Sequence, residues 1–180
     1  MSALMDVIKG RRSIRKFEPQ DLTDEQLQQI LDAVRWSPTW ANTQCCEIVV
    51  ARDPEVKKRL CETVPKSNPA AKGLASAPVI LVLCGKLQSS GYYKGEVTTK
   101  FGDWYMFDLG IASQSICLAA YDLGLGTVII GLFDHDAAGR AVGLPDGHEL
   151  VAMIPVGVPA QDSKAPKRRE IDEFSHKDRF

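Results

Sequence analysis

The sequence has 180 residues, which is the size of one domain and is long enough to bury a core without metals or disulfides. Hydrophobic residues make up 44% of it and charged residues 25%, a balance that excludes a disordered, collagen-like or coiled-coil chain. The formal net charge of −1 gives the molecule no overall field that would attract nucleic acid or a membrane surface, so neither is expected as a partner.

The cysteines indicate a reducing compartment. There are 5 of them, an odd number, with no Cys-x-x-Cys pair and no Cys-His cluster at zinc spacing, so neither a disulfide framework nor a metal site is expected. The N-terminal segment lacks the apolar stretch of a signal peptide, because Asp6 and Lys9 interrupt it. The longest apolar region, residues 104–123, contains Asp108 and predicts a buried helix instead of a membrane span. A cytoplasmic location is therefore expected.

The first half of the chain predicts helices and two strands. Thr23 and Gln26 form a capping box for a helix over residues 24–36, whose apolar residues recur at helical spacing. Asp53 and Pro54 are typical of the start of another helix. The predicted helices cover residues 3–10, 24–36, 54 to about 64 and about 70–75, and the predicted strands cover 47–51 and 79–84, the second buried on both faces.

The second half predicts one long apolar helix and two further strands. That helix covers about residues 103–123, is apolar on nearly every side and therefore belongs in a core or an interface, with Gly124 suited to its C-terminal end. Residues 86–102 carry little pattern and are expected to form a loop or irregular helix, of a length that is often functional. The remaining elements are a strand over 127–131, a helix opened by Asp134 and running through 142, and a strand over 150–154 with Pro155 close to its end.

The tail from about residue 159 is polar and has too few apolar residues to form its own core. No internal repeat or linker divides the chain before it. The sequence therefore predicts a single α+β domain over residues 1–180 with a C-terminal arm from about 159.

Two basic clusters stand out in this near-neutral chain. The first runs from Lys9 to Lys16 and places 5 cations in 8 positions, with Ser13 among them. A solvated loop and a nucleic-acid patch are two explanations. A phosphate cradle is the third, because arginine grips phosphate bidentately and a serine hydroxyl adds a neutral contact. The second cluster, Lys167–Arg169 after Pro166, is either a solvated tail or a second contact to the same phosphate dianion.

Two further segments combine turn residues with groups that could recognise a heterocycle. Residues 37–44 are rich in hydroxyl and amide side chains, which either bond their own backbone in a turn or read the polar edge of a heterocyclic ring. Residues 124–134 contain Gly-x-Gly, but this motif follows a helix and enters a strand, the reverse of a dinucleotide-binding turn. Taken alone, this segment is better explained as a helix end followed by a core strand.

Three other features carry weaker signals. Asp108 inside the apolar helix predicts a paired core carboxylate, with a catalytic acid as the alternative. Cys45 and Cys46 lie at a strand entrance and predict buried thiols more readily than nucleophiles. The histidines are scattered without the spacing of metal ligands.

In order and spacing, four segments resemble the motifs of the nitroreductase family of FMN-dependent oxidoreductases over nearly the whole chain. These segments are Arg11–Phe17, Pro38–Gln44, Gly124–Phe133 and Pro166–Arg169. The resemblance implies an α+β fold in which helices flank a central, mainly antiparallel sheet. It also implies an intertwined homodimer with two flavins at its interface, in which the C-terminal arm of each subunit crosses to the other.

The sequence departs from the family pattern at a few positions. Thr39 stands where serine is usual, Trp40 where a small residue is usual, and Cys45 where proline is common. The chain is also short around residues 86–102, the part that often covers the substrate in this family. These departures bear on the pocket for the electron acceptor more than on the binding of the flavin.

The resemblance implies a role for each matched residue. The residues that would bind the FMN phosphate and ribityl chain are Arg11, Arg12, Ser13, Lys167 and Arg169. Arg15 would approach N1 and the C2 carbonyl of the flavin. The residues that would reach the flavin, mostly from the other subunit, are Pro38, Thr39, Asn42 and Gln44. The residues that would line the ring, with a backbone N–H near N5, are Ile129, Ile130, Gly131 and Leu132. Asn68 and Lys72 are further candidates.

The implied activity passes two electrons from NAD(P)H through bound FMN to a small acceptor such as a nitroaromatic or a quinone. The kinetics are expected to be ping-pong, because donor and acceptor would use one flavin face in turn. The flavin would carry the chemistry, and Arg15 would stabilise charge that develops beside it. One alternative is a flavin-binding protein for storage, sensing or delivery of reduced flavin. Another is a nucleic-acid binder that uses the two basic clusters. The acceptor and the choice between NADH and NADPH stay open.

Overall fold

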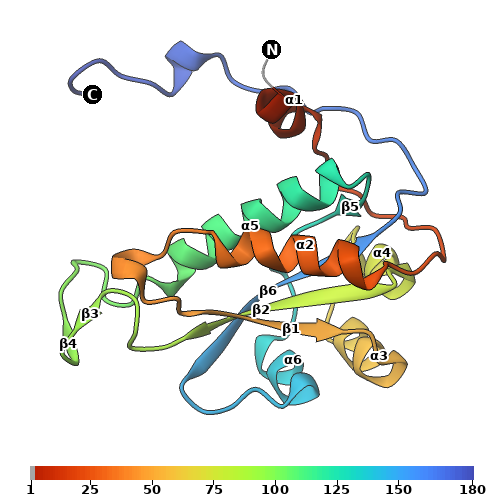
Figure 1. Ribbon diagram of the computed structural model, residues 1–180, viewed down its shortest axis with the longest axis horizontal. Coiled ribbons are helices and arrows are strands. Elements are labelled where there is room, and N and C mark those ends of the chain that lie inside the picture. The colour runs from red at the N-terminus through yellow and green to blue at the C-terminus, as the bar shows by residue number, and fades with distance from the viewer. Residues whose placement is uncertain (1–2) are drawn as a thin grey trace.

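The structure is a computed structural model that describes residues 3–180. Its helices are α1 (Ala3–Gly10), α2 (Asp24–Arg35), α3 (Pro54–Glu62), α4 (Ala71–Ser76), α5 (Tyr105–Asp122) and α6 (His135–Val142), with 3₁₀ turns η1 (Trp40–Asn42) and η2 (Ile171–Glu173). Its strands are β1 (Cys46–Ala51), β2 (Val79–Lys86), β3 (Tyr92–Tyr93), β4 (Glu96–Val97), β5 (Gly126–Thr127) and β6 (His148–Gly157). Figure 1 shows helices on both faces of one sheet, which confirms the α+β prediction.

The central sheet has the strand order β1-β2-β6-β5, and every neighbouring pair is antiparallel. Side chains of β2 alternate between two cores, as the period of a strand requires. Those that pack with α2 and α5 are Val79, Leu81 and Leu83. Those that pack with α3, α4 and α6 are Ile80, Val82 and Cys84. The sheet therefore separates two apolar layers, and the prediction that this strand is buried on both faces is confirmed.

Side-chain caps at the helix starts confirm three sequence-based boundaries. At α2 the hydroxyl of Thr23 accepts from Gln26 N at 3.2 Å, and the Gln26 side chain accepts from Thr23 N at 3.0 Å. The Asp53 carboxylate accepts two backbone N–H bonds at the start of α3, and Asp134 accepts one at the start of α6. Each cap satisfies N–H groups that a helix cannot bond internally and contributes about 1 kcal/mol.

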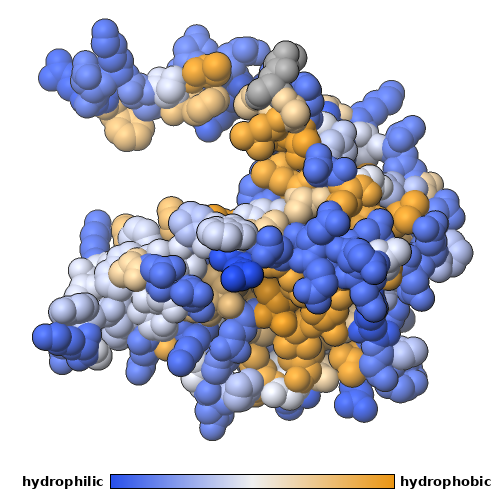
Figure 2. All heavy atoms as spheres, in the orientation of Figure 1, coloured by the Kyte–Doolittle hydropathy of each residue, from blue (hydrophilic) through white to orange (hydrophobic). Residues whose placement is uncertain are grey.

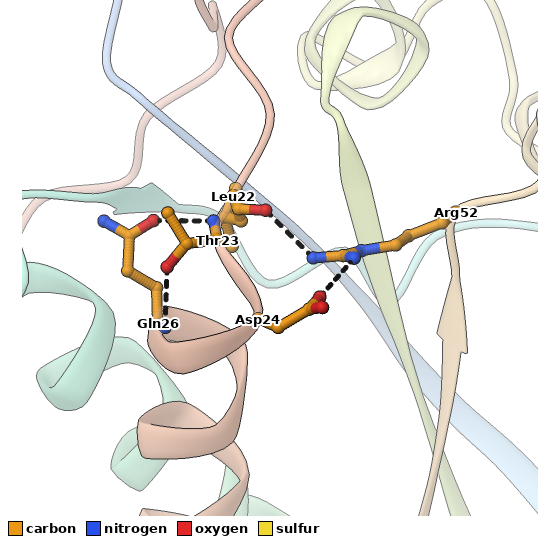
Figure 3. A network of polar contacts seen from close by, with 5 residues as sticks. All are labelled: Leu22, Thr23, Asp24, Gln26 and Arg52. Atoms are coloured by element: carbon orange, nitrogen blue, oxygen red, sulfur yellow. Dashed lines mark hydrogen bonds and ion pairs between the residues drawn. The ribbon is translucent and has the colours of Figure 1, made fainter.

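Arg52 joins the end of β1 to the start of α2 (Figure 3). Its guanidinium donates to Asp24 Oδ1 at 2.8 Å and to Leu22 O at 3.0 Å. The ion pair is exposed to solvent and so contributes at most about 1 kcal/mol. The bond to a backbone carbonyl fixes where the chain enters α2.

The sheet differs from the prediction at β5 and β6. The strand expected over 127–131 stops after two residues, and β6 continues past Pro155 instead of ending near it. In an antiparallel ladder, pairs that exchange two hydrogen bonds recur at every second residue. Ile130 and Met153 are such a pair, at 2.9 and 3.0 Å. In this register the pair two residues earlier would join Val128 to Pro155, but Pro155 has no N–H, so the ladder is interrupted there.

The β2–α5 connection, residues 87–104, is a loop with a short hairpin of β3 and β4 near its outer end. Within this connection Ser90 is fully buried, and the Ser90 carbonyl accepts from Trp104 N at 2.9 Å. Gly91 has φ of 87°, and a Cβ there would collide with the carbonyl of Gly102. The connection is thus a built element closed across its base, and the expectation of a loop is confirmed.

The C-terminal segment runs away from the sheet (Figure 1). Residues 164–180 are exposed throughout. Figure 2 shows this segment as mainly hydrophilic with isolated apolar side chains, among which Ile171 is 73% exposed and Phe174 52% exposed. No helix within residues 3–180 is both long enough and apolar enough to cross a lipid bilayer.

Candidate functional site

The basic segment, residues 11–17, is held along the edge of the sheet. Ile14 N donates to Thr127 O at 2.8 Å, and Phe17 forms an isolated bridge with Pro159 just beyond the end of β6. Ile14 and Phe17 are themselves buried, at 7% and 6% exposure. Apolar side chains therefore anchor the segment from within, and its backbone is fixed by both β5 and the chain after β6.

Two glycines let neighbouring elements approach this segment closely. A Cβ at Gly73 in α4 would lie 2.5 Å from the backbone oxygen of Arg15, and a Cβ at Gly126 in β5 would lie 2.7 Å from Ile14 Cγ1. Real Cβ atoms do not tolerate such contacts, so any larger residue would push the segment out of place. The basic segment is clamped between α4 and β5.

The arginines of the segment have different surroundings. Arg15 Nε is buried and has no hydrogen-bond partner among the described residues. A buried donor without a partner is rare and costly, and it suits an acceptor supplied by a ligand. Arg12 instead turns back to the end of α1, where it donates to Lys9 O at 2.6 Å and to Arg11 O at 2.8 Å. In this chain Arg12 therefore helps to end a helix.

A hollow of about 620 Å³ opens beside Arg11. Its lining includes Thr127 from β5, Tyr121 from the end of α5, and Gln161 and Asp162 from the chain after β6. This volume is in the range of small-molecule sites. The sequence-predicted phosphate ligands Arg11 and Arg12 both line it, and Ser13 precedes the buried Ile14.

The segment predicted to line a flavin ring alternates between buried and exposed side chains. Ile130 is 2% exposed, whereas Ile129 is 49% and Leu132 is 63% exposed. Asn68 donates to the Leu132 carbonyl at 3.3 Å, so it lies at this segment, while Lys72 is exposed on α4. The structure thus places Asn68 beside the ring-lining candidates.

A second hollow, of about 610 Å³, lies next to the same segment and is lined by Ile129, Gly131 and Met106 among others. His135 also lines it. The His135 ring stacks on Phe133 at 4.0 Å between centroids, and its two nitrogens lie 2.8 Å and 3.3 Å from backbone carbonyl oxygens. Contacts with Phe133 and with two backbone carbonyls therefore hold the His135 ring in place, which indicates a structural role.

The left-handed loop, residues 39–45, has an unusual backbone. Ala41, Asn42 and Gln44 have φ values of 45°, 55° and 53°. The Thr39 hydroxyl accepts from Gln44 N at 3.0 Å, and Thr39 O accepts from Asn42 N at 3.0 Å. The prediction that this segment bonds its own backbone is confirmed. The side chains of Asn42 and Gln44 remain exposed, as does Pro38 before them.

Asp108 underlies this loop from α5. It is 1% exposed and accepts from Trp40 N at 3.1 Å, from the Cys45 thiol at 3.3 Å and from the Ser90 hydroxyl at 2.7 Å. The prediction of a paired core carboxylate is confirmed, and the partners shown are neutral donors. Its burial keeps it from contact with a solvent-exposed substrate.

The structure brings the predicted site residues together in two separate groups. One lies along β5 and α4, where the basic segment meets Thr127 and Gly73, and where Asn68 donates to Leu132 in the chain after β5. The other is the left-handed loop, which lies at the far end of α2 from the basic segment (Figure 1). The predicted phosphate ligands Lys167 and Arg169 belong to neither group. They are exposed on the C-terminal segment, where Arg169 donates to the Glu173 carbonyl at 3.3 Å.

The surroundings of Cys45 and Cys84 keep these two thiols protonated, whereas contact with Cys45 lowers the pKa of Cys46. The pKa of Cys45 is raised well above its ordinary value, first by its contact with Cys46, then by burial and by the Asp108 carboxylate. Burial, with a smaller contribution from Glu47, raises the pKa of Cys84 to about 11. The prediction that Cys45 is a buried thiol is confirmed, whereas Cys46 is only partly buried.

Alkylation of Cys84 by iodoacetamide is expected to be slow at pH 8 and to accelerate about tenfold per pH unit toward pH 11. Its pKa of about 11 leaves far less thiolate at pH 8 than an ordinary thiol has. Because this pKa is raised in the folded state, its contribution to stability is full below about pH 8.5 and is lost as the pH rises toward 11. Peptide-resolved mass spectrometry measures the rate, with urea-unfolded protein as control. Labelling of native Cys84 as fast as in urea at pH 8 would contradict the expectation.

Two features of the site escaped the sequence analysis. Gly73 was included only in a brief helix, although a glycine inside a helix costs about 1 kcal/mol relative to alanine and so signals a close approach. Gly126 stands between Gly124, which suits the predicted helix end, and the strand predicted from residue 127, and its small size admits Ile14. In both cases the residue type was informative, but the partner lies far away in the sequence.

Comparisons with known proteins identify the family to which the chain belongs. The family model described as Nitroreductase family matches residues 8–158. A relative from Methanothermobacter thermautotrophicus, whose name refers to NADH dehydrogenase and NAD(P)H nitroreductase activity, is 30% identical over 163 residues, which are 88% of this chain and 78% of the relative.

Two solved structures are also similar. A nitroreductase family protein from Clostridium novyi NT has a TM-score of 0.78 and 28% identity, with 88% of this chain and 86% of that chain covered. The NADPH:FMN oxidoreductase from Vibrio harveyi, solved with NAD⁺, has a TM-score of 0.82 and 26% identity, with 99% and 78% covered. The family match spans the basic segment, the left-handed loop and the ring-lining candidates alike, and the chain belongs to the nitroreductase family.

Proposed function

We propose that this protein is an FMN-dependent oxidoreductase that takes electrons from NAD(P)H and passes them to a small acceptor such as a nitroaromatic or a quinone. The observation that carries the proposal is the buried Arg15 Nε without a partner among the described residues, on a segment clamped by Gly73 and Gly126. Such a donor suits an acceptor atom of a tightly held ligand. The name of the Vibrio harveyi relative supports FMN as that ligand.

The chain supplies binding and orientation. Arg11 and Ser13 would hold the FMN phosphate together with Lys167 and Arg169, and Arg12 would contribute at the phosphate once its contacts with α1 are exchanged. Arg15 would face N1 and the C2 carbonyl, and residues 129–132 would line the ring. FMN held by these residues would supply the two-electron redox chemistry between NAD(P)H and the acceptor. The charge of Arg15 would stabilise the reduced form.

A homodimer would complete the site. In one chain the left-handed loop and the basic segment lie at opposite ends of α2, about 18 Å of helix apart. A second copy could bring its loop, with Pro38, Thr39, Asn42 and Gln44, to the flavin of the first. Exposed apolar side chains support such an interface; they are Leu4 and Ile8 on α1, Met106 and Phe107 on α5, and Ile171 and Phe174 on the C-terminal arm. Each subunit, a single domain over residues 1–180, would then extend its C-terminal arm, from about residue 159, to its partner. The free cysteines fit a cytoplasmic location.

The test begins with the cofactor. Protein purified from cells is expected to be yellow and to release FMN, and not FAD, on denaturation, because a basic cradle without a pyrophosphate-binding turn suits one phosphate. Chromatography of the released flavin decides the identity. Release of FAD, or no flavin binding after reconstitution, would remove the central claim.

Steady-state kinetics test the activity itself. With NAD(P)H and a quinone varied together, double-reciprocal plots are expected to be parallel, because one pocket serves donor and acceptor in turn. Converging lines would show that both substrates bind at once. Tight FMN binding without turnover on any acceptor would instead favour storage, sensing or delivery of flavin.

A further inference from the structure

The left-handed loop is a strained structure that needs an external support. Three of its residues, Ala41, Asn42 and Gln44, have positive φ, and two of these are not residue types that favour it. Such conformations persist only where the surroundings determine them. The loop's own hydrogen bonds join Thr39 to Asn42 and Gln44 and join Trp40 to Thr43, and these bonds do not tie the loop to another element.

That support comes from Asp108, which lies in the first turn of α5. Its Oδ1 accepts from Trp40 N at 3.1 Å, at the start of the strained turn, and its Oδ2 accepts from the Cys45 thiol at 3.3 Å, at the end of it. The two bonds therefore span the residues with positive φ. A carboxylate that is 1% exposed and bonded at both ends of a loop fixes the loop's position against a rigid helix.

The β2–α5 connection takes part in the same cluster. Ser90 is 0% exposed and donates to Asp108 Oδ2 at 2.7 Å, the shortest of the three contacts. Ser90 O also accepts from Trp104 N at 2.9 Å, which closes the base of the connection. The connection thus covers Asp108 and supplies it with a hydroxyl, and one carboxylate joins three segments that are distant in the sequence.

We propose that Asp108 is a positioning residue that holds the left-handed loop in the shape that presents Asn42 and Gln44 to the flavin, with Ser90 fixing the Asp108 carboxylate. The inference rests on the proposed function for its flavin part. It gives a role to residues 87–104 that does not require them to touch the substrate. Asp108 acts through the backbone of Trp40 and touches neither cofactor nor reacting atoms.

The experiment compares four variants of the full chain. Asp108→Ala removes every acceptor, Asp108→Asn keeps one oxygen, and Ser90→Ala removes one donor. Ile116→Ala is the matched control, because Ile116 is 0% exposed on the same helix but belongs to the core between α5 and the sheet. Urea unfolding gives the free energy of unfolding of each variant, so that a local change in the loop can be distinguished from a loss of global stability.

The first readout is amide hydrogen exchange of residues 39–46 in flavin-free protein. Asp108→Ala is expected to speed exchange at Trp40 at least about tenfold beyond Ile116→Ala, with Asp108→Asn and Ser90→Ala in between, because a hydrogen bond to a charged group is lost. Equal exchange rates at Trp40 in Asp108→Ala and Ile116→Ala would show that Asp108 does not hold the left-handed loop. If Asp108→Ala does not fold, unchanged exchange in both Asp108→Asn and Ser90→Ala overturns it.

The second readout is the dissociation constant of FMN with the visible spectrum of the bound flavin. Asp108→Ala is expected to bind FMN about tenfold to a hundredfold more weakly and to shift the spectrum, whereas Ile116→Ala leaves both unchanged. Faster exchange with unchanged FMN affinity would overturn the flavin part alone. If the wild-type protein binds no FMN, the proposed function fails, while the exchange data still decide whether Asp108 holds the loop.

Discussion

Replacing Arg15 with alanine is expected to slow reduction of bound FMN by NAD(P)H about 10²–10³-fold, even when FMN saturates the protein. The reason is that charge appears beside Arg15 only in the reduced state, so the loss falls on the reaction and not mainly on binding. The flavin potential is expected to become more negative. Stopped-flow reduction and a redox titration measure the two effects, and the buried Arg15 Nε without a partner in residues 3–180 motivates them.

Arg169→Ala is the matched control, because it also removes one cation. Arg169 is exposed on the C-terminal segment and is proposed to touch only the phosphate, which does not change during the reaction. Its loss is expected to weaken FMN binding by about 1.5–3 kcal/mol, and excess FMN should restore most of the turnover. Equal rescue of both variants with unchanged potentials would mean that Arg15 is only another phosphate or surface cation.

Gly73→Ala is expected to lower the free energy of unfolding by about 1–3 kcal/mol and to abolish tight FMN binding. The new Cβ would lie 2.5 Å from the backbone oxygen of Arg15, and a backbone atom in a clamped segment cannot move aside as a flexible side chain can. The gain in helix propensity, up to about 1 kcal/mol, offsets only part of the loss. Urea unfolding and FMN titration measure the two effects.

Gly139→Ala serves as its control, since Gly139 is also a buried glycine in a helix. A Cβ there would meet only the Leu144 side chain, at 3.4 Å. Its stability is therefore expected to stay the same or to rise slightly, with FMN affinity unchanged. Wild-type stability and affinity in Gly73→Ala would show that α4 does not clamp the basic segment tightly.

Elements whose signals are local were predictable from the sequence. The helix α2 follows from a capping box and from apolar residues at helical spacing, and both lie within its own residues. The starts of α3 and α6 follow from Asp53 and Asp134 in the same way. For β2, six consecutive apolar residues are enough to indicate burial on both faces.

Features that depend on distant partners were not predictable in the same way. The end of β5 follows from Pro155, which stands opposite Val128, 27 positions earlier in the chain, and has no N–H to donate to it. The cations of the site were visible as a cluster, but their placement depends on Gly73 and Gly126, whose small size matters only against Arg15 and Ile14. Likewise, Asp108 was visible as a core carboxylate, while its partners come from two other segments.

Because the ladder is interrupted at Pro155, the backbone after β5 can be fixed in position without belonging to a continuous strand. The chain leaves β5 at Thr127 and rejoins the same register at Ile130, so the short stretch between them is tethered at both ends without being part of a continuous strand. Its main-chain groups are held still by the fold and not by the side chains next to them. The exposed side chain of Ile129, which lies within this stretch, can therefore be replaced without breaking a ladder hydrogen bond. A single proline thus leaves a short segment that is fixed in position although it belongs to no continuous strand.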